Sequence, residues 1–423
     1  MTEATEPARL PTDWRSDAMQ KRIRRRYVSE RNFKFLGLFA VTLSAGFLAF
    51  LIVTMGWNGA RGFTRSNVDV PFDFPALAIP LSAAALSGGG DADSQFAAAD
   101  LPGATTRAAE AAFGAGSGTA LSDSGWLAVR KAIQADPGIL SRKAVISVPA
   151  SPALGIAEGG EGDPAMQKLY AALDAKGAVS RSFNLNFLTD SDATDPTQAG
   201  IWGALKGSLL TMLVTIMLAF PIGVLSAIYL EEYAPRNRWT DLIEVSINNL
   251  AAVPSIIFGL LGLAVFLNTL DLPRSAPLVG GMTLALMTMP VIVIAGRNAI
   301  KAVPPSIRDA ALGIGASPIQ VVFHHVLPLA LPGILTGTII GMARALGETA
   351  PLLMIGMRAF VATPPGGITD PSSVLPVQIF LWSDEISRGF IEKTSAAIIV
   401  LLVFLLAMNG AAIYLRNRFE TRW

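Results

Sequence analysis

The chain has 423 residues, of which 52% are hydrophobic and only 15% are charged. This balance suits a protein with several membrane spans better than a soluble one. The formal net charge is +1, so the sequence gives no electrostatic case for binding nucleic acid. Cysteine is absent, which excludes disulfides and thiolate metal sites.

Six apolar runs reach the length of about 20 residues that a membrane-spanning helix needs. They lie near residues 35–55, 205–230, 242–267, 278–295, 329–354 and 395–415. Lys and Arg are concentrated before the first run, and the positive-inside rule therefore places the N-terminus in the cytoplasm. Six crossings put the second and fourth loops and the C-terminus on the same side, and each of these segments carries arginine.

This topology divides the chain into five parts. We expect a cytoplasmic tail, a first span, an inserted extracytoplasmic domain, a helical membrane region and a second cytoplasmic tail. The corresponding residues are 1–34, 35–56, 57–196, 197–415 and 416–423.

The inserted segment 57–196 has the patterns of a small α/β domain. Apolar side chains alternate in 68–74 and 183–187, as in half-buried strands, and have helical spacing in 126–133 and 163–173. About 120 residues are enough to bury a modest core. Nothing in the segment resembles a catalytic set.

The fourth loop, 298–328, has the sequence signals of two short helices with a glycine joint between them. Ser306 and Asp309 have capping-box spacing for the first helix. Gly313 and Gly315 can supply the left-handed backbone that ends it.

The second helix of this loop is predicted from Ser317, Pro318 and Gln320, which fit the N-cap, N1 and N3 positions. Pro328 is expected to bring it toward its end. The small side chains of 309–311 would let another protein approach the backbone of the first helix closely. The alternative is a well-capped loop that only joins two spans.

A charged pair lies within the fifth apolar run. Arg344 and Glu348 are four residues apart, so we expect them on one helical face. Ionisable groups at that depth cost several kcal/mol unless they are partnered or hydrated, which makes them a functional-site hypothesis. The guanidinium suits phosphate or sulfate oxygens, and Glu348 would temper its affinity. The alternative is an ion pair that fixes helix packing, beside a small face formed by Gly337, Gly341, Ala345 and Gly347.

Several kinds of chemistry are not expected of this chain. It has no G-x-x-x-x-G-K-[ST] motif, so any ATP hydrolysis would have to come from a partner. His324 and His325 are adjacent and would point apart on a helix, so a metal site is not expected. No arrangement suggests catalytic residues, a bound cofactor or an enzyme.

Two groups of motifs resemble known transport proteins. Asp309-Ala310-Ala311, then Gly315 and then Leu327-Pro328 resemble the cytoplasmic "EAA" loop of ABC importer permeases, with Asp309 in the place of the usual Glu. The segment 343–353 resembles the signature of the PstA family of phosphate ABC transporter permeases, as do 229–233 and 254–259. The resemblance covers about residues 197–420.

The resemblance implies an all-α polytopic membrane protein with six transmembrane helices in a type I importer-like bundle, and the inserted α/β domain is larger than the loop usual in the family. The chain would be the inner-membrane permease subunit of an ATP-driven phosphate importer. Its expected partners are a PstC-like second permease, a PstB-like ATPase dimer, a PstS-like periplasmic phosphate-binding protein and membrane lipid. The inserted domain would contact the binding protein or only brace the assembly.

The resemblance also implies roles for individual residues. The coupling loop that docks on the ATPase would include Asp309, Ala310, Ala311, Gly315, Leu327 and Pro328. The substrate pathway would include Arg344, Glu348 and Thr349. Other readings remain open: transport of sulfate or molybdate on the same architecture, an ion-coupled secondary carrier, or a membrane sensor.

Overall fold

The computed structural model describes residues 16–77, 79–81, 92–358, 360–387 and 389–419. The chain forms two compact units, residues 1–57 and 58–423. Parts of the two expected tails, residues 1–15 and 420–423, lie outside the described residues.

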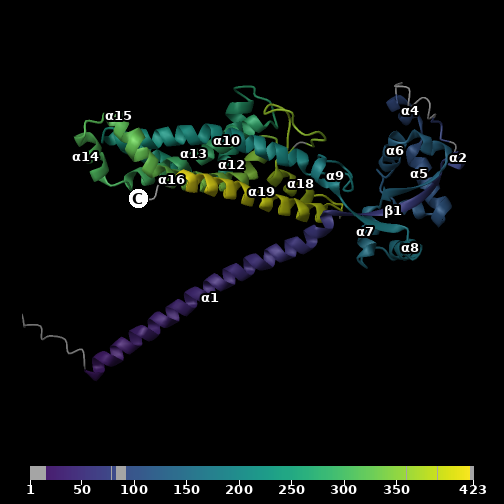
Figure 1. Cartoon of the computed structure of the whole chain (residues 1–423), viewed down its shortest axis with the longest axis horizontal. Helices are drawn as coiled ribbons and strands as arrows, with labels where there is room; N and C mark the ends of the chain where they lie inside the picture. The colour runs from purple at the N-terminus through teal and green to yellow at the C-terminus, as the bar shows by residue number, and fades with distance from the viewer. Residues whose placement is uncertain (1–15, 78, 82–91, 359, 388, 420–423) are drawn as a thin grey trace, which may run out of the picture. The chain divides into compact units, whose positions relative to one another are not determined.

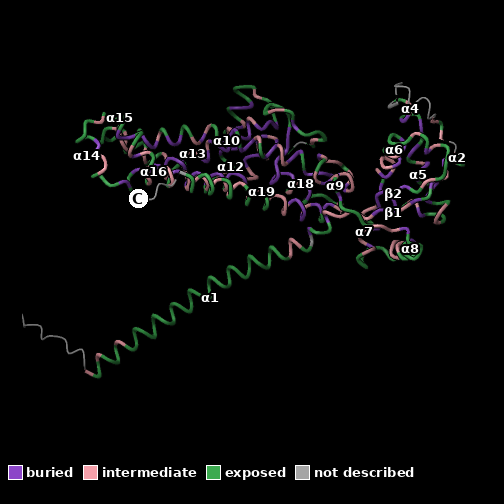
Figure 2. The backbone as a smooth tube through the Cα atoms, viewed as in Figure 1, coloured by how far each residue is buried: buried purple, intermediate pink, exposed green. Residues whose placement is uncertain are grey.

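The described residues of the first unit form most of a single long helix, α1 (Asp17–Gly62). The helix starts with a basic segment, in which Lys34 pairs with Glu30 at 2.6 Å. Its apolar part follows, and Figure 2 shows that most residues there are exposed. An apolar helix of this length with exposed side chains is suited to lipid. The expected first span, 35–56, lies within it.

The second unit contains a three-stranded antiparallel sheet in the order β2-β1-β3. The strands are β1 (Thr64–Asp73), β2 (Lys143–Pro149) and β3 (Val179–Phe183). In the central strand β1, Pro71 lies opposite Val145 of β2, beyond Val68, where the pairing with β3 ends. The missing N–H of Pro71 therefore costs no hydrogen bond to β3.

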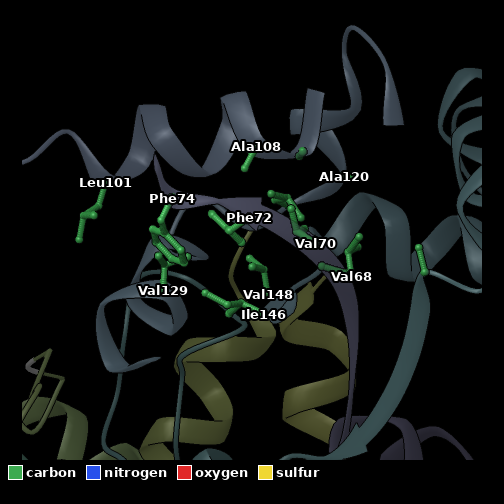
Figure 3. Close-up of a cluster of buried hydrophobic side chains, with 14 of the residues drawn as sticks. Val68, Val70, Phe72, Phe74, Leu101, Ala108, Ala120, Val129, Ile146 and Val148 are labelled. Carbon is green, nitrogen blue, oxygen red and sulfur yellow. The ribbon is translucent and has the colours of Figure 1, made fainter. Parts of the chain in front are cut away.

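Short helices cover this sheet. They are α2 (Phe74–Leu77), α4 (Ala92–Ala98), α5 (Leu101–Phe113), the 3-10 turns η1 (Ser117–Ala120) and η2 (Pro137–Ser141), α6 (Trp126–Ala135), α7 (Pro152–Glu158), α8 (Pro164–Ala175) and α9 (Leu185–Thr189). Figure 3 shows alternate side chains of β1, namely Val68, Val70 and Phe72, meeting Leu101, Val129 and Val148 in one buried cluster. Helices α5 and α6 pack against β1 and β2 to close it.

The structure contains three of the four elements predicted in the inserted segment. Strand β1 contains the alternation predicted for 68–74 except for Phe74, which begins α2. Helix α6 covers 126–133, and α8 begins after Asp163, whose carboxylate accepts a hydrogen bond from Ala165 N. The prediction of a strand through 183–187 was wrong. Asn184 accepts a hydrogen bond from Phe187 N and starts the helical turn α9 there.

The rest of the second unit is helical. Its elements are α10 (Trp202–Ile228), the π-helix η3 (Tyr229–Tyr233), α11 (Arg238–Ala251), α12 (Ser255–Leu261), the π-helix η4 (Gly262–Leu267), α13 (Pro277–Lys301), α14 (Pro305–Gly313), α15 (Pro318–Gln320), the π-helix η5 (Val321–Val326), α16 (Leu327–Leu346), α17 (Ala350–Met354), α18 (Leu375–Ser383) and α19 (Gly389–Phe419). Helix α13 packs between α10 and α16, and α16 also contacts α19 (Figure 1).

Among the described residues, five helices are long and apolar enough to cross a membrane. A sixth crossing requires α11 and the helix from Ser255 to Leu267 to count as one span, although they are bent by 103°. The expected third span, 242–267, is therefore present as a bent pair of helices and not as one continuous helix. Pro254 disfavours helical backbone in the residue before it, which explains the break at this point.

Candidate functional site

The loop between α13 and α16 begins with α14, whose N-cap is Pro304 and whose N1 residue is Pro305. Ser306 therefore lies inside the first turn, and the prediction that Ser306 and Asp309 form a capping box was wrong. The fixed φ of a proline suits the N1 position, where no N–H is needed, so this helix starts two residues earlier than the capping pattern indicated.

Helix α14 ends in a Schellman motif at Gly315. The φ of Gly315 is 91°, its N–H donates to Leu312 O at 2.9 Å, and Ala316 N–H donates to Ala311 O at 3.1 Å. Gly315 thus ends the helix as predicted, while Gly313 remains helical. These hydrogen bonds fix the direction in which the chain leaves α14.

The second helix has the predicted capping box. Ser317 N–H donates to Gln320 Oε1 at 2.9 Å, and Gln320 N–H donates to Ser317 Oγ at 3.4 Å. The helix does not end near Pro328 as expected, because it continues through η5 into α16. The π-helical turn directly before Pro328 opens the backbone, which accommodates a residue without an N–H.

The loop exposes a different surface from the one that the sequence indicated. Asp309 and Ala310 are exposed, but Ala311 is buried against Val321 and Val322 in the chain's own core. The exposed apolar side chains are Leu312, Ile314, Ile319 and Phe323, and Ile314 is 83% exposed. A capped loop that presents several apolar side chains is suited to docking against another protein.

Arg308 ties α14 to the end of α10. Its Nη2 lies 2.6 Å from Glu232 Oε1, and its Nε donates to the same carboxylate at 3.2 Å. The guanidinium also donates to the backbone carbonyls of Val303 and Ile300. The contacts with Glu232 hold the start of the loop to the span that ends in η3, and those with Val303 and Ile300 hold α14 to the end of α13.

A second ion-pair cluster lies beside this one. Arg297 of α13 contacts Glu244 of α11 at 2.8 Å and Glu231 of η3 at 3.4 Å, and Lys301 lies 3.5 Å from Glu231. Arg297 and Glu231 are mostly buried.

The sequence analysis did not predict the pairing of these charged residues, namely Glu231, Glu232, Arg297 and Arg308. The sequence did contain a signal for these pairs. Two adjacent carboxylates, Glu231 and Glu232, follow the apolar run 205–230 on the predicted cytoplasmic side. Three basic residues near the fourth loop are predicted on that same side, namely Arg297, Lys301 and Arg308.

The structure brings Arg344 and Glu348 together at a break between two helices. Helix α16 ends at Leu346, and Glu348 lies between it and α17, whose N-cap is Thr349. The expected continuous helical face was therefore wrong. Arg344 Nε and Glu348 Oε1 are 3.6 Å apart. Because a guanidinium has five N–H donors, this single contact leaves donors of Arg344 for another group.

Helix α16 packs closely against α13 on one face and leaves Arg344 exposed on another. Gly337 and Gly341 give α16 the small face that we predicted, since an added Cβ would meet Ala295 and Thr288 of α13. Gly347 is exposed and forms the helix end instead. The side chain of Arg344 is 48% exposed and that of Glu348 is 19% exposed. Arg344 thus lies on a side of α16 that its own chain leaves open.

His324 and His325 line a cavity of about 750 Å³ together with residues of α13 and α14. The cavity walls are mainly apolar, from Ala302, Val303 and Ile307 among others. Among the residues that the structure describes, no group of three or more His, Asp or Glu could hold a metal ion.

Comparisons with known proteins identify the chain's relatives. Residues 219–421 match the family described as "binding-protein-dependent transport system inner membrane component". Residues 20–168 match "Domain of unknown function (DUF3333)". A solved structure of the MetNI methionine ABC transporter is 16% identical, with a TM-score of 0.41, and the match covers 52% of this chain and 95% of that one.

Two curated relatives are more similar in sequence. The probable ABC transporter permease protein YqgI of Bacillus subtilis is 30% identical over 263 residues, which are 58% of this chain and 87% of the relative. The phosphate transport system permease protein PstA of Yersinia pestis is 30% identical over 212 residues, which are 50% of this chain and 70% of the relative. These relatives are transport components and not enzymes, as we predicted for this chain. The chain therefore belongs to the ABC transporter permease family, the inner-membrane components of binding-protein-dependent transport systems, and within it is PstA-like.

Proposed function

We propose that the chain is the permease subunit of an ATP-driven phosphate importer. The observation that carries the proposal is the capped loop 298–328, which Arg308 anchors to Glu232 and which exposes Leu312, Ile314 and Phe323. An importer needs such a contact to receive motion from a separate ATPase. The name of the relative PstA supports phosphate as the substrate.

The proposed topology follows the positive-inside rule. The N-terminus, the loop around Asp309 and the C-terminus lie in the cytoplasm, and the inserted segment 57–196 lies outside it. The partners are a PstC-like permease, two copies of a PstB-like ATPase and a PstS-like phosphate-binding protein. The ATPase uses the ATP, and this chain holds no cofactor.

Coupling would run through the loop into two spans. ATP binding closes the ATPase dimer and moves the surface of α14 around Asp309 and Ala310, while Ala311 and Gly315 keep the loop rigid. Arg308 carries this movement to the end of α10 through Glu232. Leu327 and Pro328, in the first turn of α16, carry it along the helix that bears Arg344.

The substrate pathway would pass the break between α16 and α17. Arg344 has donors that Glu348 leaves free, and a guanidinium fork matches two phosphate oxygens. Glu348 repels the anion enough to let it leave, and Thr349 adds a hydroxyl at the same break. The second permease would cover the side on which Arg344 is exposed, because a charge at this depth needs a partner or water.

The test is uptake of radiolabelled phosphate into vesicles that contain this chain with its permease, ATPase and binding-protein partners. We expect ATP-dependent uptake that excess sulfate or molybdate does not reduce. Competition by either anion would assign the pathway to another oxyanion. Uptake driven by an ion gradient without the ATPase would contradict the proposal.

Substitution separates the role of Arg344 from assembly. Arg344→Gln is expected to remove uptake while the complex still assembles, because the fork for the anion is lost. Arg274→Gln, which changes an exposed arginine before α13, makes the same change of charge and should leave uptake intact. Normal uptake by Arg344→Gln would refute an essential anion role.

A further inference from the structure

A cavity of about 280 Å³ lies within the second unit, where the α/β region meets the start of α19. Its walls come from the last turn of α1, the start of β1, α7, β3 and the first turns of α19. Asp309, Arg344 and Glu348 are not among the residues that line it. The cavity is therefore separate from the sites described above.

The charged side chains of this cavity are unbalanced. Four cationic residues line it, Arg61, Arg65, Arg181 and Lys393, against two carboxylates, Glu158 and Glu392. One carboxylate is already engaged. Glu158 pairs with Arg181 at 2.8 Å and accepts a hydrogen bond from Ser66 Oγ at 2.6 Å.

The other cations have weaker partners. Arg65 Nε donates to the amide oxygen of Asn67 at 3.0 Å, and burial lowers the pKa of Arg65 from its ordinary value. Within the described part of the chain, no carboxylate lies within ion-pair distance of Arg61 or Arg65. The guanidinium of Arg65 has therefore lost part of its water without a carboxylate at ion-pair distance.

Lys393 is the most deeply buried charge in the cavity wall, with 6% of the residue exposed. Its Nζ donates to Gly62 O at 3.3 Å and lies 4.9 Å from the centre of the Phe187 ring. A carbonyl and an aromatic face stabilise an ammonium only in part, and no ion pair joins Lys393 to a carboxylate in the described residues. Glu392, the second carboxylate of the wall, and Asp195 act on Lys393 from a distance, but neither forms an ion pair with it in the described residues. The buried ammonium therefore lacks a directly paired counter-ion, which indicates an anion as the missing partner.

We propose that this cavity binds a phosphate-type oxyanion between Arg61, Arg65 and Lys393. Two guanidinium forks and a buried ammonium supply the donors that a tetrahedral oxyanion needs. Because these residues come from α1, β1 and α19, the bound anion joins the α/β region to the last span. The chemistry is the same for free phosphate and for a lipid headgroup. The site does not depend on which substrate the permease carries.

The test uses the full-length chain in its permease–ATPase complex, without the binding protein, in detergent free of phospholipid. An Arg344→Gln background removes the proposed pathway site, and equilibrium binding of radiolabelled inorganic phosphate is measured. Arg61→Gln combined with Arg65→Gln should weaken binding at least about tenfold, because charge-assisted hydrogen bonds are lost. Arg107→Gln, on the exposed surface of α5, is the matched control and should bind as the background does.

A second arm identifies the source of the phosphate group. If inorganic phosphate does not bind, the complex is transferred to nanodiscs containing phosphatidylglycerol. A rise in Tm there that the double variant loses assigns the site to a lipid headgroup. Phosphate binding that the double variant keeps, or the absence of both effects, would overturn the proposal. Since none of these readouts needs transport, the result is independent of the uptake experiment.

Discussion

The α/β region and the helical region of the second unit bury their apolar side chains in different ways. In the α/β region, Val70, Phe72 and Val129 are closed inside one core that the region forms by itself (Figure 3). In the helical region, α11 has no buried residue, and apolar side chains such as Leu242 and Leu260 are exposed. The first region is stabilised by its own residues, whereas the second leaves apolar surface for lipid or another subunit.

Both regions contain local caps and long-range polar contacts, as the capping box at Ser317 and the hydrogen bond between Ser66 and Glu158 show. In the α/β region, side chains such as Asp100, Asp136 and Asp163 cap helices or turns locally. In the helical region, Arg308 and Arg297 join elements that are far apart in sequence. The caps fix the ends of single elements, while the ion pairs of Arg308 and Arg297 hold the loop 298–328 and α11 to the spans.

The largest expected effect tests the self-contained core. Phe72 is almost fully buried and stacks on Phe74 with ring centres 5.4 Å apart. Phe72→Ala should destabilise the chain by roughly 3–5 kcal/mol, because it removes apolar contacts and leaves a cavity. Leu260→Ala, on the exposed side of α12, should change the thermal stability of the isolated chain in detergent little. Equal losses of Tm in the two variants would refute the contrast between the regions.

The second effect tests the anchor of the coupling loop. Arg308→Met leaves the mostly buried Glu232 without its partner, which should cost roughly 2 kcal/mol and reduce phosphate uptake at least about tenfold. Lys301→Met is the control, because Lys301 is half-exposed and lies 3.5 Å from Glu231, an arrangement worth about 0–1 kcal/mol. The measurements are uptake and ATP hydrolysis by the same vesicles. Coupled uptake in Arg308→Met would show that the anchor is dispensable.

The third effect concerns two glycines that lie two residues apart in the loop. Gly315 has φ 91°, so Gly315→Ala should cost about 1–2 kcal/mol and loosen the end of α14. Gly313 is helical with open space around it, so Gly313→Ala should stabilise α14 by up to about 1 kcal/mol. The rate of limited proteolysis within the loop reports both changes. Opposite shifts of that rate are expected, and shifts in the same direction would contradict the assigned backbone roles.

The sequence predicts local structure well where one short pattern decides it. The alternation at 68–72, the caps at Asp163 and Ser317 and the left-handed Gly315 are all present in the structure. The prediction from sequence was wrong where two local signals favoured different structures. Pro328 indicated a helix end, but the preceding π-helical turn carries the chain onward, and the spacing of Arg344 and Glu348 indicated one helix, but α16 ends between them.

The sequence indicates which charged groups lie on the same side of the membrane, but not which of them pair with one another. Nothing near Arg308 indicates that Glu232, 76 residues earlier, accepts its hydrogen bonds, because the packing of α10 on α13 places them together. The same applies to Lys393, whose burial depends on Gly62 and Phe187. Such contacts follow from the tertiary fold, and a single sequence does not encode them in any local pattern.

The smallest expected effect comes from two aspartates in the loop before α10. Asp195 is partly buried, which raises its pKa, but the donors of Ser122, Ser124 and Thr197 outweigh that effect and hold the pKa below its ordinary value. Asp192 accepts a hydrogen bond from Trp382 Nε1 at 2.9 Å, yet burial dominates and raises its pKa. The ionised form is therefore favoured by folding at Asp195 and disfavoured at Asp192.

These opposite shifts predict opposite dependences on pH. The stabilisation by Asp195 is fully present above its unfolded pKa of 3.8 and is lost as the pH falls through the lower folded value. At Asp192 the folded pKa is the higher one, so ionisation destabilises the chain as the pH rises above 3.8. Asp195→Asn should thus reduce the free energy of unfolding at pH 7 by about 1 kcal/mol and lower the Tm. The same substitution should lower the Tm much less near pH 3. Asp192→Asn should leave the Tm at pH 7 unchanged or raise it. If both variants lower the Tm equally at pH 7, the two carboxylates do not differ as the structure indicates.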